Sequence, residues 1–395
     1  MSQSTSNSWQ PFRPTEADLK AIAQDVADVP GIQVQLLDGH GDLHLPDRVA
    51  HQYQIAGGKI LLKVARDLPA PIKGIGLFIP GAEYVGIGRI STGLGTPHIE
   101  TNPDFLGITA AFQTRDRCRI DFLAINDPTA PTDNHRDFVD VLRATAKSAS
   151  AYLPLVGEWG AYDVGNLLAE QTVFAKTLAE RVGALKAGKC LAHITKQTLP
   201  TAYSSTAWQR YWTGIVELGG TAGKFAFVPM HDENTRPRLR PGERHLSEDW
   251  RQRQSKGDIA FQLYWIPFLT QDATPTGQLT RAWDEGHKTV VGTITFPRVE
   301  PKSDEARLWS ALATEMGANP GNWVADSGNT IKQPATAFGI ARKLGYALSQ
   351  QGRGALEPQA YQRVFETGQI NADLAQELNR RREQKEALGH ISCAP

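Results

Sequence analysis

The chain has 395 residues, of which 41% are hydrophobic and 21% charged, as in a globular protein with a substantial core. Lysine plus arginine and aspartate plus glutamate both number 42, so no excess charge predicts binding to nucleic acid or to an anionic membrane. The cysteines are odd in number and widely spaced, which argues against a disulfide framework and a cysteine-rich metal site: Cys118, Cys190 and Cys393.

The N-terminal segment, residues 1–9, is polar and lacks the apolar core of a secretory signal. No stretch approaches the roughly 18 consecutive apolar residues that suggest a membrane-spanning helix. We therefore expect a cytoplasmic protein without a membrane span. The length is compatible with one large domain or two smaller ones.

The first part of the chain predicts a helix followed by a β-rich region. Residues 14–29 have helical periodicity, and Thr15 and Asp18 have the spacing of a capping box at its start. From residue 46 to 128 the pattern changes to short apolar runs between Gly and Pro. These strands are too close together for helical crossovers and should pair antiparallel, as a curled sheet or barrel. They are expected at 59–64, 75–79, 85–90, 108–113 and 119–123.

The rest of the chain predicts mostly helices. In the middle we expect helices at 138–148 and 167–182 and a strand at 261–267. The stretch 231–245 is rich in arginine, which suits either an anion or RNA site or a solvated loop; the loop is the favoured interpretation. Beyond it we expect a strand at 289–296, a helix capped by Ser303, and helices at 334–351 and 372–387.

Arg342, Tyr346 and Arg353 are the first candidates for chemistry. Residues four and seven apart share one face of a helix. Tyrosine is ordinarily a poor metal ligand because its pKa is about 10, but a guanidinium one turn away and a bound Fe(III) both favour the phenolate. The spacing therefore suits a haem iron held through tyrosine oxygen. The alternative is an amphipathic helix with a half-buried tyrosine beside two arginines.

His51 is the second candidate. A histidine beside a peroxide can take the proton from one oxygen and deliver it to the other, which promotes O–O cleavage. The alternative is a histidine with a structural role. His40 and His44 lie nearby and could suggest a metal site, but the Gly and Asp residues around them favour a turn.

The third candidate is the run Arg89-Ile90-Ser91-Thr92, at the end of an expected strand. Its arginine could pair with an anionic group such as a haem propionate through its fork of donors. Three glycines upstream, Gly81, Gly86 and Gly88, faintly resemble a phosphate loop. No Lys-Ser/Thr follows them and the context is a strand, so nucleotide binding is not expected.

Together these segments resemble the haem catalase superfamily, especially its smaller catalase-related members. The motifs occur in the family's order, and the similarity is best over 46–128 and 283–353. The matching segments are Asp47-Arg48-Val49-Ala50-His51, Arg89-Ile90-Ser91-Thr92, Gly107-Ile108-Thr109-Ala110-Ala111-Phe112, Asp121-Phe122-Leu123-Ala124-Ile125-Asn126-Asp127-Pro128, and Arg342, Tyr346 and Arg353.

The resemblance implies an α+β fold in which an antiparallel β-barrel is surrounded by helices, with haem b buried between the barrel and a C-terminal helix. It implies one domain over 1–395: an N-terminal arm and helix (1–45), a barrel with inserted helices (46–300) and C-terminal helices carrying the haem tyrosine (301–395). Tyr346 would be the proximal iron ligand and Arg342 would keep it ionised. The resemblance further assigns a distal acid/base pair, His51 and Asn126, and haem-binding residues, Arg48, Arg89, Ser91 and Arg353.

Three positions depart from the catalase pattern. On direct register Ile125 replaces the distal asparagine, with Asn126 as its neighbour; Ala50 replaces a valine, and Gln54 stands where a glycine usually follows the histidine. These departures bear more on fast peroxide dismutation than on haem binding.

The resemblance implies a haem-dependent oxidoreductase that reacts with hydrogen peroxide or an organic hydroperoxide, as a peroxidase or weak catalase. The alternatives are an enzyme that rearranges hydroperoxides or performs another haem-based oxidation, and a catalytically weak protein that binds or senses haem. The expected partner is the small-molecule peroxide, and no binding of nucleic acid is expected. Because members of the family tend to form dimers or larger assemblies, the resemblance also implies a homo-oligomer.

Overall fold

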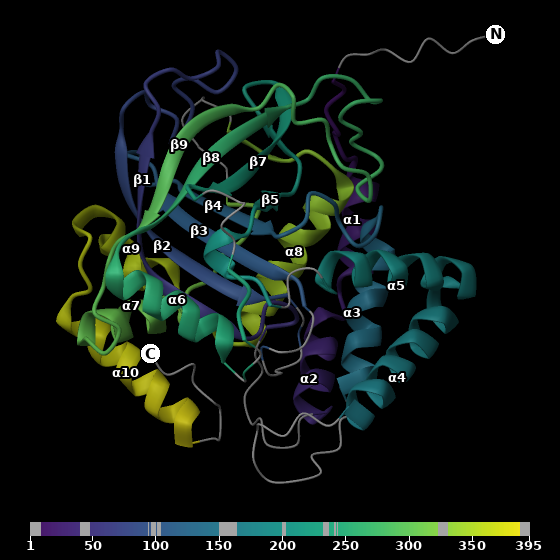
Figure 1. Cartoon of the computed structure of the whole chain (residues 1–395). Helices are drawn as coiled ribbons and strands as arrows, with labels where there is room; N and C mark the ends of the chain where they lie inside the picture. Colours follow the sequence, from purple (N-terminus) through teal and green to yellow (C-terminus); the bar gives the residue numbers. More distant parts are fainter. Residues whose placement is uncertain are drawn as a thin grey trace.

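Ten antiparallel strands form one sheet in the described part of the chain, and eight of them close into a barrel (Figure 1). The computed structural model describes residues 9–39, 48–93, 95, 100, 104–149, 164–199, 203–231, 237–240, 242, 244–322 and 331–387. The barrel strands are β1 (Gln54–Val64), β2 (Glu83–Thr92), β3 (Leu106–Gln113), β4 (Arg119–Ile125), β5 (Tyr211–Thr213), β7 (Thr221–Pro229), β8 (Ile259–Pro267) and β9 (Thr289–Phe296).

The barrel closes because β7 pairs with β5 on one side and with β8 on the other, while β9 pairs with β1. Two short strands, β6 (Val216–Leu218) and β10 (Ile331–Pro334), extend the sheet beyond β7. Side chains alternate between the faces of a strand, so each barrel strand has an inward and an outward set. The inward set is a hydrophobic core that includes Phe112, Phe122, Phe225, Phe261 and Phe296.

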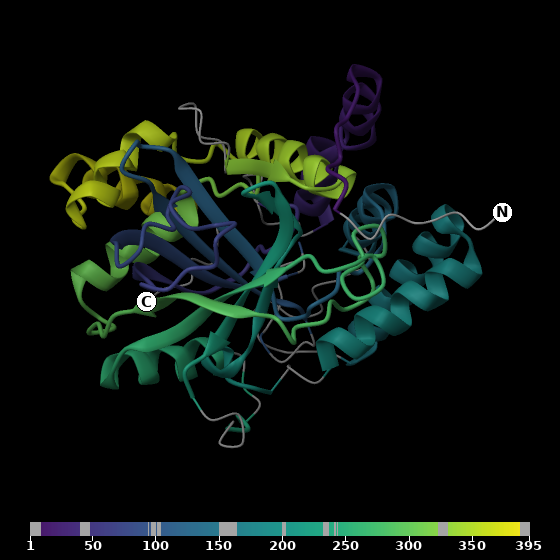
Figure 2. The same ribbon diagram turned by 90° about the horizontal axis from the view of Figure 1, so that it is seen from above.

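Helices cover the outside of the barrel in two groups (Figures 1 and 2). In the first group, α7 (Asp304–Glu315), α9 (Pro358–Thr367) and α10 (Ala372–Ala387) form a core with outward side chains of β2 and β3, and α6 (His245–Lys256) contacts β1. The second group comprises α1 (Glu16–Asp25), α2 (Val29–Gly39), α3 (His135–Ala149), α4 (Val164–Val182), α5 (Ala184–Thr198) and α8 (Ala337–Gly352).

The predicted α+β barrel with surrounding helices is confirmed. Four of the five strands expected before residue 128 lie within β1 to β4, and the capping box of Thr15 and Asp18 is formed. The predicted strand at 289–296 and the terminal helix at 372–387 have the bounds of β9 and α10.

Two local predictions were wrong. The segment 75–79 is a turn rather than a strand, because Gly74 and Gly76 adopt φ values of +82° and +56° that interrupt an extended chain. The expected helix at 14–29 ends at Asp25, and α2 begins at Val29. Pro30 explains the break: within a continuous helix its ring would clash with the carbonyl of residue 26, whereas the first turn of α2 accepts it.

Several elements were not predicted, and some predictions lie outside the described residues. No prediction was made for α2, α5, α6, α9 or the strands β5 to β7, and Pro334, the first residue of the expected helix at 334–351, is the last residue of β10. His40 and His44 lie outside the described residues, as does part of the arginine-rich stretch.

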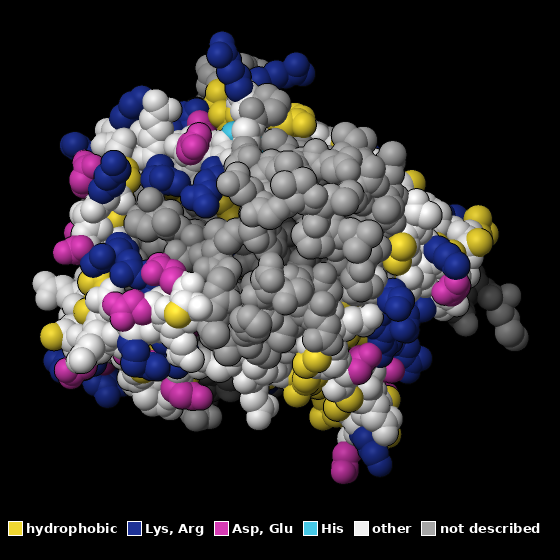
Figure 3. Space-filling model, turned by 90° about the horizontal axis from the view of Figure 1, so that it is seen from below, with side chains coloured by type: hydrophobic (Ala, Val, Ile, Leu, Met, Phe, Trp, Pro, Cys, Tyr) yellow, Lys and Arg dark blue, Asp and Glu magenta, His cyan; other side chains and the backbone are white. Residues whose placement is uncertain are grey.

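The described surface agrees with the balanced composition. On the face shown in Figure 3, basic and acidic side chains are interspersed. Among the residues that the structure describes, no helix has both the length and the apolar character needed to cross a membrane.

Phe225 provides a test of the barrel core. Its ring centroid lies 5.4 Å from that of Phe78, 5.1 Å from Phe122 and 5.0 Å from Trp265. Because truncation leaves a cavity among rigid rings, Phe225→Ala should lower the free energy of unfolding by about 3–5 kcal/mol. Guanidinium denaturation would measure it, with the exposed Leu61→Ala as control. A loss no larger than that of the control would contradict this core.

Candidate functional site

A cavity of about 460 Å³ lies between the outer face of the barrel and the helices, and both His51 and Tyr346 line it. Outward side chains of β2, β3 and β4 form one wall, among them Arg89, Thr109 and Ile125. Residues of α3 and α8 also line the cavity. The structure therefore brings together candidates separated by almost 300 positions. The candidates in the lining are Arg48, His51, Arg89, Arg342, Tyr346 and Arg353.

The backbone of His51 has an unusual conformation, with φ at +59°. This left-handed region is costly for a residue with a side chain, by roughly 1–3 kcal/mol, and persists only where contacts fix it. The His51 N–H donates to the Gly93 carbonyl at 2.9 Å, and its own carbonyl accepts from Arg89 Nη2 at 2.7 Å. These contacts hold His51 at the cavity wall just before β1.

The His51 ring is fixed by Ser91 and Gly107. Its Nδ1 lies 3.1 Å from Ser91 Oγ, and a Cβ on residue 107 would lie 2.5 Å from its Cε1. Glycine at 107 thus leaves the space that the ring occupies. Burial, together with the positive charges of Arg89 and Arg342, lowers the pKa of His51 to about 3. The imidazole is consequently neutral at pH 7. Ser91 contacts the histidine and is not among the residues lining the cavity.

Ile125, and not Asn126, lines the cavity. The Asn126 Oδ1 accepts from the Leu106 N–H at 2.7 Å, and its backbone N–H donates to the Leu106 carbonyl at 2.9 Å. Within the described residues, the buried Nδ2 of Asn126 has no hydrogen-bond partner. The side chain therefore ties the end of β4 to the start of β3.

Tyr346 comes from α8, which starts at the cap formed by Thr336, whose side chain accepts from the Gly339 N–H. Positions three and four apart bring one face of this helix to the cavity: Arg342, Gly345, Tyr346 and Ser349. The Arg342 guanidinium carbon lies 5.7 Å from the centroid of the Tyr346 ring. The predicted pair thus forms one charged, aromatic wall.

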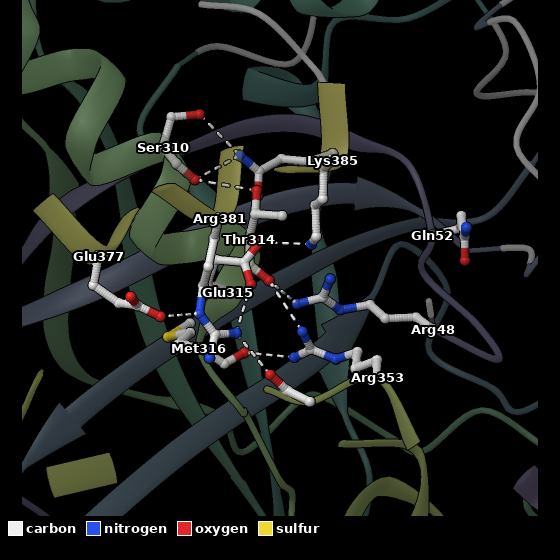
Figure 4. A network of polar contacts seen from close by, with 12 residues as sticks. Arg48, Gln52, Ser310, Thr314, Glu315, Met316, Arg353, Glu377, Arg381 and Lys385 are labelled. Atoms are coloured by element: carbon white, nitrogen blue, oxygen red, sulfur yellow. Dashed lines mark hydrogen bonds and ion pairs between the residues drawn. The ribbon is translucent and has the colours of Figure 1, made fainter. Parts of the chain in front are cut away.

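Arg48 and Arg353 meet at the C-terminal end of α7 (Figure 4). Arg48 Nη2 donates to the Thr314 carbonyl at 2.6 Å. Arg353 donates to the Thr314 carbonyl at 3.4 Å and to the Met316 carbonyl at 2.7 Å. Cations are stabilised at a helix C-terminus, which favours both guanidinium groups here. The cavity therefore has a positively charged edge.

Arg89 is connected to the same helix by Gln54. Arg89 Nε donates to Gln54 Oε1 at 3.1 Å, and that oxygen also accepts from Thr314 Oγ1 at 2.9 Å. Gln54 Nε2 in turn donates to the Ser310 carbonyl at 3.1 Å. The glutamine that departs from the catalase pattern thus links a buried arginine to α7.

Sequence reasoning did not assign roles to Gln54, Gly107, Thr314 or Lys224. Lys224 is 5% exposed, lines the cavity and donates to the Pro128 carbonyl at 3.0 Å. Burial lowers the pKa of Lys224 to about 8, against the raising effect of Asp127 and Glu285. The sequence signal that could have identified Lys224 is a lysine within an apolar run, since Lys is almost never buried without a partner.

No family model matches the chain, and no curated protein matches it in sequence. Solved structures do match in fold. A fungal catalase aligns with a TM-score of 0.56 and 16% identity over 78% of this chain and 59% of its own. A bacterial catalase gives 0.55 and 18% over 94% and 67%. Catalase A from Saccharomyces cerevisiae gives 0.56 and 15% over 82% and 63%.

The chain therefore has a catalase-like fold, and the resemblance noted in its sequence is confirmed for the fold. It spans about 59–67% of the length of these catalases.

The low pKa of His51 predicts a pH dependence of stability. As pH falls below 6.5, the unfolded chain binds a proton at this residue, whereas the folded chain does so only near pH 3. The contribution to stability is thus complete above 6.5 and is lost as pH falls toward 3. When the pH is lowered from 7 to 5, the free energy of unfolding should fall in both proteins. The fall should be about 2 kcal/mol smaller for His51→Gln than for the wild type. Urea denaturation of the haem-free protein at both pH values would measure it; equal losses would contradict it.

Proposed function

We propose that the chain is a haem-dependent oxidoreductase that reacts with hydrogen peroxide or an organic hydroperoxide. The observation that carries the proposal is that Tyr346 and His51, from opposite ends of the sequence, line one cavity of a catalase-like fold. A phenol oxygen can serve as an axial ligand of haem iron, and a neutral imidazole can accept and return a proton.

The lining of the cavity fits haem b. A volume of about 460 Å³ is within the usual range for small-molecule sites. Its walls are largely apolar and include Val49, Phe105 and Leu123. The positive edge made by Arg48, Arg89 and Arg353 suits the carboxylate substituents of the macrocycle. Tyr346 would hold the metal, with Arg342 beside its ring. Haem bound here would supply a ferric iron that exchanges electrons with the peroxide.

His51 would serve as the acid/base. Being neutral at pH 7, its imidazole can accept the proton from the near oxygen of the peroxide and return it to the departing oxygen. The contact with Ser91 Oγ and the close approach to Gly107 keep the ring in one orientation. Because the ring is already held in one orientation, little entropy is lost when it adopts the reactive geometry.

The walls around His51 favour a peroxidase over a fast catalase. Ile125 gives the lining an apolar side chain, while the amide of Asn126 is bonded to Leu106. Without a polar anchor beside the imidazole, hydrogen peroxide has fewer hydrogen bonds to gain. Further from His51 the lining includes apolar side chains of α3 and α5, such as Leu142 and Ile194, which suit an organic substituent. The same apolar walls support the second candidate, rearrangement of an organic hydroperoxide.

Tyr346→Phe tests the proximal assignment. It removes the oxygen that would bind the iron and leaves the ring, so the purified variant should be largely haem-free or have an altered ferric spectrum. Absorption spectra with haem quantification would measure this. Tyr264→Phe, on β8, is the matched control and should keep the wild-type haem content. An unchanged ferric spectrum in Tyr346→Phe would rule out this ligand.

His51→Ala tests the acid/base and separates enzyme from haem carrier. The rate of the haem absorbance change after mixing with peroxide should fall on the order of 10²–10⁴-fold, while haem content stays near wild type. Stopped-flow mixing with hydrogen peroxide and with a bulkier alkyl hydroperoxide would measure it. His135→Ala, which also changes a histidine of the lining, should react at close to the wild-type rate.

Two outcomes would count against the enzyme. Equal rates for wild type and His51→Ala with both oxidants would show that His51 is not the base. A wild-type protein that binds haem but reacts with neither oxidant would favour a haem-binding or sensing protein.

A further inference from the structure

Glu315, the last residue of α7, has an electrostatically unfavourable position. Its side chain is 6% exposed and lies at the end of the helix where the dipole is negative. A buried carboxylate in such a place is strongly destabilising unless cations compensate for it. The residues that compensate for it are therefore important for the end of α7.

Two of the compensating cations, Lys385 and Arg381, come from the terminal helix α10 (Figure 4). Lys385 Nζ lies 2.6 Å from Glu315 Oε1, and Arg381 Nη1 lies 3.3 Å from Glu315 Oε2. Arg381 is oriented by two further contacts. Its Nε lies 2.7 Å from Glu377 Oε1, and its Nη1 donates to the Gly354 carbonyl at 2.7 Å. Burial would raise the pKa of Glu315, but Lys385, Arg353 and Arg381 outweigh it and lower that pKa. The carboxylate is therefore ionised at neutral pH.

The residues on either side of Glu315 hold the arginines of the cavity. Thr314 and Met316 supply the carbonyls that bind Arg48 and Arg353, and the Thr314 hydroxyl reaches Arg89 through Gln54. The Glu315 carbonyl itself accepts from the Leu356 N–H at 2.9 Å, which joins α7 to the segment after α8. A shift of this turn would move all three arginines together.

We propose that α10 is an electrostatic clamp on the cofactor site: its ion pairs with Glu315 fix the end of α7 and thereby position Arg48 and Arg353 toward the carboxylates of the cofactor. The inference rests on the proposed function, since it assumes that the cavity binds haem. Glu315, Arg381 and Lys385 are positioning residues; they act through the α7 carbonyls.

The clamp is tested on the haem-loaded full-length chain by the rate of haem transfer to excess apomyoglobin, without peroxide. Lys385→Met removes one of the positive charges beside the buried Glu315 carboxylate. The variant should release haem about tenfold faster than the wild type, and a tenfold change corresponds to about 1.4 kcal/mol. Adding Glu315→Gln removes the charge that needed compensation, so the double variant should return to within about twofold of wild type. Lys385→Arg should keep the wild-type rate.

Arg380→Met is the matched control. Arg380 is on the same helix, but it pairs with Glu377 and Gln384 of α10 itself, so its loss should not change haem release. A role of α10 in packing alone would not be rescued by Glu315→Gln.

Two results would overturn the clamp. In the first, Lys385→Met takes up haem normally and releases it at the wild-type rate. In the second, the double variant releases haem as fast as the single one. A wild-type protein that takes up no haem would instead overturn the proposed function, and the clamp with it.

Discussion

Closure of the barrel is the constraint on which the rest of the structure depends. Once β7 pairs with both β5 and β8, every barrel strand has an enclosed face, and that face is filled by large aromatic side chains. A core packed in this way leaves no space for a ligand. The chemistry-bearing residues must then occupy the outward positions of the same strands, under helices that shield them from water. Arg89, Ser91 and Gly107 have such positions, opposite in phase to Ile90 and Ile108 of the barrel core.

The position of the second wall follows from helix packing. Val26, Val29, Ile340 and Ala341 belong to one apolar cluster that joins α1, α2 and α8, and this cluster fixes the helix that carries Tyr346. Because α7 packs on β1 and β2, its C-terminal carbonyls reach the arginines beside His51. Each half of the site is thus supported by a separate hydrophobic cluster, and the cavity is the space between them.

The sequence predicted what local patterns and motif order determine. Short apolar runs between Gly and Pro predicted β1 to β4, and the Arg342–Tyr346 spacing predicted a shared helix face. It could not show that Arg48 and Arg353 share the Thr314 carbonyl, because residues 48, 314 and 353 meet only through the fold. The strand prediction at 75–79 failed since apolar content was given more weight than the two glycines with positive φ. No role was predicted for Lys224, because a single charged residue in a β-rich run forms no motif with its neighbours in the sequence.

The departures from the catalase pattern have different structural consequences. Gln54 makes hydrogen bonds to Arg89 and to α7, so at this position a long polar side chain contributes to the arginine network. Ile125 changes the lining beside His51 and leaves the backbone pairing of β4 intact, since its partners are Gly107 and Trp212 in the ladder. A substitution on the outward face of a strand can therefore alter the cavity without disturbing the barrel core, because the two faces of the strand share only the backbone. The same separation lets the helical wall, with Leu142 and Ile194, change the shape of the cavity independently of the polar side chains on the strands.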